Sequence, residues 1–271
     1  MTAFIYAAVG LYPGDEAAAR PEVVGGLSRL LALAPAARGA CRLGCTCGEE
    51  ESALFAQYAV QARRNALGAL LTLVVRHPAV AEALSKDDAA LRALTAIIGP
   101  PRPGLFGAAP EAYASDPGPS DEVVMALTLL AVVARGGMFR RAAIALTPGA
   151  RAALAGLLTP SPADPRIRCA AVVCGAARLL AVMLEAKPGE EMSGPFITRG
   201  LDQAARAPLL ASLSALAAGG GAARFGATAS PRLVASGALE RCAANASFCY
   251  EQLQMFFNAN IMSLLGGASK S

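Results

Sequence analysis

The sequence contains no tryptophan and few other aromatic side chains. Aromatic residues make up only 5% of the 271 positions, whereas hydrophobic residues as a whole make up 55%. Strands of all-β sandwiches are enriched in Val, Ile and aromatic residues, so this composition disfavours an all-β fold. Alanine, the best helix former, dominates instead, often in pairs and triplets. The composition favours helices that approach one another closely.

Histidine occurs once, at His77, which limits the chemistry available to the chain. A serine or cysteine nucleophile commonly needs a histidine base, and His77 directly precedes Pro78 at the predicted end of a helix. The carboxylates cluster at Glu49–Glu51, Asp87–Asp88 and Glu190–Glu191, and such sequence neighbours do not face one another on a helix. No glycine-rich stretch carries the Lys-Ser/Thr of a phosphate-binding loop. The sequence therefore predicts no enzyme, no catalytic residues and no cofactor.

Long runs of apolar or basic residues are also missing. A membrane-spanning helix needs about 20 apolar residues, but the uncharged stretches Asn65–Val75 and Val123–Ala134 hold eleven and twelve. The stretch Pro208–Ala222 is longer, but it ends in glycines and its residues are mostly small. The apolar segment Met1–Tyr12 has no Lys or Arg and so lacks the basic region of a signal peptide; we expect a first helix there, with a weak signal sequence as the alternative. Net charge is +4, yet no basic run exceeds two residues, whereas nucleic-acid binders cluster such residues with aromatics between them. The sequence predicts no transmembrane segment and no nucleic-acid ligand.

Seven cysteines, an odd number at irregular spacing, do not form the pattern of a disulfide framework. A reducing compartment, the cytoplasm, is the expected location. Cys41, Cys45 and Cys47 form one compact cluster, but a zinc site needs about four ligands and no fourth lies nearby. We predict free thiols in a loop and no metal. A zinc- or thiol-dependent protein that uses this cluster stays open as an alternative function.

Helical periodicity fills the segments between the Pro- and Gly-rich stretches. Apolar residues that share one side at 100° per residue indicate an amphipathic helix. Such a helix is predicted to end at Arg76-His77-Pro78, because proline disfavours the α conformation in the residue before it, and a second helix ends at Ile98. The apolar positions are Ala66, Leu67, Leu70, Leu73 and Val74 in the first helix, and Leu91, Leu94, Ile97 and Ile98 in the second.

The apolar positions of both helices recur further along the chain. Repeats of this length, built only from helices, indicate a solenoid in which neighbouring units share one core. At an offset of 60, Ala66, Leu67, Leu70 and Leu73 align with Ala126, Leu127, Leu130 and Val133, while Ala93, Leu94, Ile97 and Ile98 align with Ala153, Leu154, Leu157 and Leu158. Looser copies place Leu129–Val132 against Leu179–Val182 at an offset of 50, and Ala150–Leu158 against Ala205–Leu213 at 55.

The pattern A-L-x-x-L-L, a short break and a second A-L-x-x-L-L before Gly or Pro resembles armadillo and HEAT repeats. The stretch ALTPGARAALAGLLTP, Ala145–Pro160, carries the resemblance best, and the likeness covers about Glu22 to Leu213. It implies an all-α, right-handed α-solenoid in which residues 1–271 form a single domain. Long loops are expected at about 35–48, 100–120, 187–197 and 219–231.

One departure from the armadillo pattern limits what the resemblance implies about function. Armadillo proteins that grip extended peptides carry Asn, with Trp nearby, on the helix that lines the groove. The equivalent positions here are Ala69, Leu129 and Leu179, and the chain has no Trp. The Asn clamp of nuclear import receptors is therefore not expected.

The sequence predicts a scaffold that binds another protein along a groove of helical repeats, because solenoids commonly bind through one row-like surface. A helix or segment carrying acidic residues would suit the basic residues on that face. The alternatives are a face covered by the chain's own loops, or one that binds an apolar ligand or a membrane surface. The offsets place Asp121, Ala171 and Val182 on this face together with the predicted partner-binding residues Gln61, Arg64, Thr72, Thr128, Arg135, Arg178 and Glu185.

Overall fold

The structure is a computed structural model that describes residues 20–32, 49–100, 121–159, 164–185, 198, 201–220, 225, 229 and 231–267. Within these ranges every regular element is helical and no strand occurs, which confirms the predicted all-α class. The predicted loops at 35–48, 187–197 and most of 100–120 and 219–231 lie outside the described residues.

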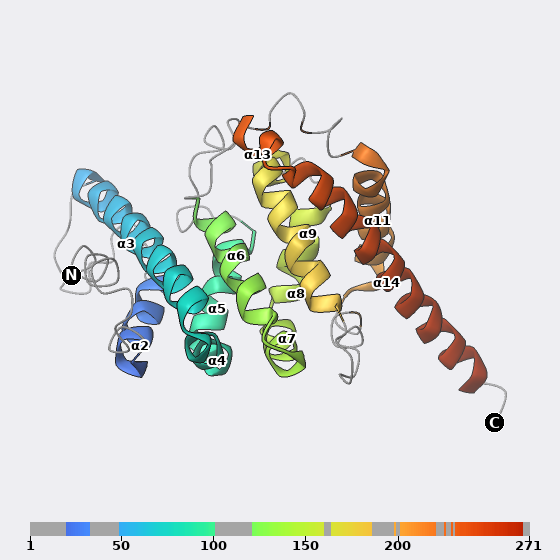
Figure 1. The fold of residues 1–271 in the computed structure, drawn as a ribbon, viewed down its shortest axis with the longest axis horizontal. Helices are drawn as coiled ribbons and strands as arrows, with labels where there is room; N and C mark the ends of the chain where they lie inside the picture. Colours follow the sequence, from blue (N-terminus) through green and yellow to red (C-terminus); the bar gives the residue numbers. More distant parts are fainter. Residues whose placement is uncertain are drawn as a thin grey trace.

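The described chain consists of successive helices (Figure 1). In chain order they are α2 (Pro21–Leu31), α3 (Glu49–Arg76), α4 (Pro78–Lys86), α5 (Asp88–Ile98), α6 (Glu122–Ala134), α7 (Met138–Leu146), α8 (Ala150–Leu158), the 3-10 turn η3 (Pro165–Arg168), α9 (Ala170–Leu184), α11 (Gln203–Ala215), the π-helical turn η4 (Leu216–Gly220), α13 (Pro231–Ala235) and α14 (Ala238–Gly267).

Helix boundaries fall where local chemistry requires them. The helix α3 ends at Arg76, as predicted from Pro78, and His77 occupies the extended break before α4. Asp87 caps α5, because its carboxylate accepts the backbone N–H groups of Ala89 and Ala90 at 3.0 Å each. Such caps satisfy amide donors that have no partner within the helix. Sequence chemistry alone therefore positions the turns between α3, α4 and α5.

The helices form two rows that pack against each other (Figure 1). In the first row α3 contacts α6, α6 contacts α9, and α9 contacts α14. In the second row α2 contacts α5, α5 contacts α8, and α8 contacts α11. The rows meet through the pairs α2–α3, α5–α6, α8–α9 and α11–α14. The sequence offsets thus align helices that are successive neighbours in space: α3 with α6 and α6 with α9, and α5 with α8 and α8 with α11.

The core lies between the rows and includes the predicted apolar positions. Leu67, Leu70, Leu127 and Leu130 are each at most 1% exposed. Small residues allow the helices to approach, since a Cβ added to Gly175 of α9 would lie 3.2 Å from Cδ1 of Leu127 in α6. The equivalent positions of the second row, Leu94, Ile97, Ile98, Leu154, Leu157 and Leu158, are also buried.

The length and hydropathy of the helices also bear on membrane insertion. In the part of the chain that the structure describes, no helix combines the length and apolar character needed to cross a bilayer.

Replacing Leu70 by Asp is expected to destabilise the fold strongly. Leu70 is fully buried, and a carboxylate there would lack both water and a partner, which costs several kcal/mol. The matched control is Val75→Asp on the same helix, because Val75 is 72% exposed. Thermal melts followed by circular dichroism should show a much lower Tm for Leu70→Asp than for Val75→Asp. Equal melting temperatures would contradict a core shared between α3 and α6.

Candidate functional site

The predicted partner-binding residues lie in or next to three neighbouring helices of the first row. None of the seven is fully buried, and three are exposed. In α3 they are Gln61, Arg64 and Thr72; in and after α6, Thr128 and Arg135; in and after α9, Arg178 and Glu185.

The helix α6 carries a clear stripe of half-buried residues on the side away from the core. Val124, Thr128 and Val132 are half-buried and follow one another at intervals of four residues, so they share one side of the helix. The opposite residues, such as Leu127 and Leu130, are fully buried. The Thr128 hydroxyl donates to the carbonyl of Val124 at 2.8 Å, which leaves its methyl group and the two valines to form an apolar strip.

The half-buried stripe continues onto the helices that flank α6. The residues on α3 are equivalent to those on α6 at an offset of 60, and those on α9 at 50. We call this surface the outer face, and it comprises Arg64, Gly68 and Thr72 of α3, Val124, Thr128 and Val132 of α6, and Cys174 and Arg178 of α9.

Three residues that the offsets placed on this face are buried, so the prediction was wrong for them. Asp121 is 5% exposed, because its carboxylate turns back to cap α6 and accepts the N–H groups of Val123 and Val124 at 2.9 and 3.4 Å. Ala171 and Val182 are 8% and 7% exposed. Both belong to α9, which packs between α6 and α14.

Positive charge lies around the middle of α9, which packs between α6 and α14. Arg178 is half-buried in the middle of α9. Burial and then the like charges of Arg135 and Arg241 hold the pKa of the Arg178 guanidinium below its ordinary value. Guanidinium groups nevertheless remain protonated near neutral pH, so three positive charges act on one part of the surface. Sequence reasoning missed Arg241, because the last repeat is too degenerate to align α14 with α9.

A buried ion pair fastens α3 to α6 beside the outer face. Arg63 donates from Nε to Oε1 of Glu122 at 2.9 Å and from Nη2 to Oε2 at 3.4 Å. The Arg63 side chain is 0% exposed and that of Glu122 is 13% exposed. Burial raises the pKa of the Glu122 carboxyl from its ordinary value, against the lowering effect of Arg63. The sequence held a signal for this pair, since the offset of 60 aligns Arg63 with Val123, next to Glu122.

The raised pKa of Glu122 predicts an unusual pH dependence. The folded chain binds this proton more tightly than the unfolded chain, so the stabilisation is complete below the ordinary value of 4.5 and is lost as pH rises through the higher folded pKa. Glu122→Gln cannot titrate. The free energy of unfolding of the wild type relative to Glu122→Gln should therefore increase as pH falls from 7 towards 4.5, as measured by urea unfolding.

The control is Glu82→Gln, relative to which the wild type should not gain stability as pH falls from 7 towards 4.5 and should lose it below 4.5. The Lys86 ammonium lowers the pKa of Glu82, so stability from that group is lost as pH falls through its folded pKa. A wild type that loses stability relative to Glu122→Gln on acidification would contradict the account of this ion pair.

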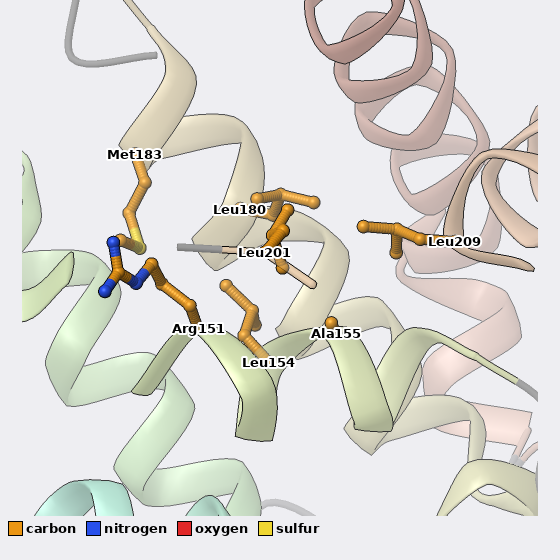
Figure 2. Close-up of a pocket in the computed structure, with 7 residues that line it drawn as sticks. All are labelled: Arg151, Leu154, Ala155, Leu180, Met183, Leu201 and Leu209. Carbon is orange, nitrogen blue, oxygen red and sulfur yellow. The ribbon is translucent and has the colours of Figure 1, made fainter. Parts of the chain in front are cut away.

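A small cavity lies between α8, α9 and α11 (Figure 2). Its volume is about 10 Å³, which is enough for about one water molecule. A small-molecule site usually measures roughly 300 Å³ or more, so this cavity does not support binding of an apolar ligand. Its lining residues are Arg151, Leu154, Ala155, Leu180, Met183, Leu201 and Leu209.

The described cysteines do not form a metal site or a reactive thiol. Cys41, Cys45 and Cys47 lie outside the described residues. Among residues whose positions are described, no three His, Cys, Asp or Glu side chains lie together as metal ligands would. Cys249 of α14 donates from Sγ to the carbonyl of Ala177 in α9 at 3.7 Å, and burial raises the pKa of its thiol. A thiol that stays protonated serves packing rather than nucleophilic attack.

Known proteins provide no further guide. No family model, curated protein or solved structure matches the chain. The function must therefore be inferred from the arrangement of the chain's own residues.

Proposed function

We propose that the chain is a right-handed α-solenoid of armadillo or HEAT type that works as a non-catalytic scaffold for protein–protein interaction. The order in which the helices contact one another supports this architecture. The sequence offsets relate α3, α6 and α9, which form one row, and α5, α8 and α11, which form the other. In such arrays each unit buries its apolar face only against its neighbours. Equivalent residues then follow one another in lines across the surface.

The outer face is the observation that carries the proposed function. Its three helices present half-buried small and apolar side chains, such as Gly68, Val124 and Val132, together with Arg64 and Arg178. Small side chains let a partner backbone approach, while partly covered valines offer apolar area that a partner can remove from water. A helix or extended segment laid across α3, α6 and α9 is the partner that this face fits.

The described cysteines bear on the compartment in which the scaffold works. We place it in the reducing cytoplasm, where thiols persist, because Cys169, Cys174, Cys242 and Cys249 carry thiols rather than disulfides. The partner is another protein, which the scaffold binds without catalysing a reaction on it. The side chains of the outer face that could donate or accept protons are arginines, threonines and the Cys174 thiol, and the hydroxyls of Thr72 and Thr128 already donate to carbonyls of their own helices.

Photo-crosslinking tests the proposal without advance knowledge of the partner. A benzoylphenylalanine side chain placed at Thr128 should form covalent adducts with a small, reproducible set of proteins in cells that express the full chain. The matched control places the same group at Ala152, which is exposed on α8 in the other row. The adducts at position 128 should be absent at position 152.

A second variant separates binding from folding. Thr128→Glu introduces charge into the half-buried strip and should remove the interaction while the Tm falls by no more than a few degrees, since the position is not in the core. Adducts shared by both crosslinking positions, or partners retained by Thr128→Glu, would refute the outer face as the binding surface.

A further inference from the structure

Arg135 and Arg241, which lie in or next to the two helices that flank α9, both act electrostatically on Arg178 of α9, although the three residues are far apart in sequence. Arg135 directly follows α6, Arg178 lies in the middle of α9, and Arg241 lies in the first turn of α14. The three helices are successive neighbours in the first row. Arg178 is therefore central, and its guanidinium experiences the charges of the other two. We call these three residues the arginine patch.

Arg178 is unfavourably placed in the chain alone. Among the described residues, no ion pair or hydrogen bond between Arg178 and a carboxylate occurs, and the charges that act on it are positive. Glu122 and Glu82 pair with other cations, Glu122 with Arg63 and Glu82 with Lys86. A half-buried cation among like charges is stabilised only when an anion joins it.

The surroundings of the patch define which anion fits. Cys174 lies one turn before Arg178 in α9, and Val132 lies less than one turn before the end of α6; both are half-buried. A ligand that covers this place must therefore combine negative charge with apolar side chains. Nucleic-acid surfaces call for aromatic side chains between basic ones, and the described residues of the outer face include no aromatic side chain.

We propose that the arginine patch recognises clustered Asp or Glu side chains of the protein segment that lies on the outer face. This inference rests on the proposed interaction function and names the chemistry of the partner. The carboxylates pair with the guanidinium groups, which can donate two parallel hydrogen bonds to each carboxylate, and the flanking apolar residues of the segment cover Val124, Thr128 and Val132. The patch thereby fixes the direction and register of the bound segment.

Selection from a displayed library of random 16-residue peptides tests this inference directly. The full chain is immobilised, and the recovered peptides are sequenced. They should carry clustered Asp or Glu next to apolar residues, well above the starting frequency. Their affinity, measured by fluorescence anisotropy, should fall by at least on the order of tenfold in Arg178→Glu/Arg241→Glu and weaken steeply with salt.

Matched variants keep the test independent of folding. Arg92→Glu on α5 makes the same charge change as Arg178→Glu at an exposed position and should leave peptide affinity unchanged. Arg178→Gln should also weaken binding, yet its Tm should not fall, because the substitution relieves like-charge repulsion. A clear fall in Tm for Arg178→Gln would assign the arginine a structural role and overturn the proposal.

The outcomes separate the two proposals. Recovered peptides without acidic bias, whose binding is lost in Thr128→Glu but kept in Arg178→Glu, would overturn the arginine patch and leave the scaffold function standing. Binding of single-stranded DNA or of phosphatidylserine vesicles at affinities equal to the peptides would overturn recognition of an acidic segment. No peptide recovered above a blank surface would overturn both proposals.

Discussion

The structure depends on one packing constraint: the apolar stripe of each helix is too wide for a single neighbour to cover. The helix α6 illustrates it, because nine of its thirteen residues are buried. It contacts α3 on one side, α9 on the other and α5 behind it. Removing any of these helices would expose apolar area worth roughly 25 cal/mol per Å². Fold, stability and surface therefore follow from how neighbouring helices share their apolar sides.

Sharing the core in this way leaves one side of each first-row helix for other uses. The buried sides are filled by large aliphatic residues such as Leu67 and Leu127, and small residues such as Gly175, which lies against Leu127, allow close contact between neighbouring helices. Charged residues lie between packed helices where they are paired, as Arg63 of α3 is with Glu122 of α6. Arg178 has no such partner among the described residues. An arginine placed in this way suits the binding of an anion but lowers the stability of the free chain.

The features that depend on neighbouring residues in the chain could be predicted from the sequence. The end of α3 before Pro78 follows from a backbone rule that holds in any fold. The buried positions of α3 and α6 were predictable because both helices repeat the same apolar spacing at one offset. The burial of Asp121 was not, since it depends on the direction in which a capping carboxylate turns. Arg241 was also missed, because α14 packs beside α9 without preserving the repeat in its sequence.

The partner-binding residues show how far sequence reasoning extends. Alignment of equivalent positions identified the half-buried stripe around Thr128, because helical periodicity fixes which residues oppose the core. It also placed Arg64, Arg135 and Arg178 on one face, and so predicted that this face is basic. It could not show that Arg241 acts on Arg178, since that requires the spacing and orientation of α9 and α14.

Hydrogen exchange of Leu130→Ala tests the shared core most directly. Leu130 is buried in the middle of α6, and truncating such a residue costs about 2 to 5 kcal/mol. If neighbouring helices share one core, amide exchange measured by mass spectrometry should accelerate in α3 and α9 as well as in α6, and least in α2, which has no substantial contact with α6. Acceleration confined to α6 and the turn after it would contradict the account.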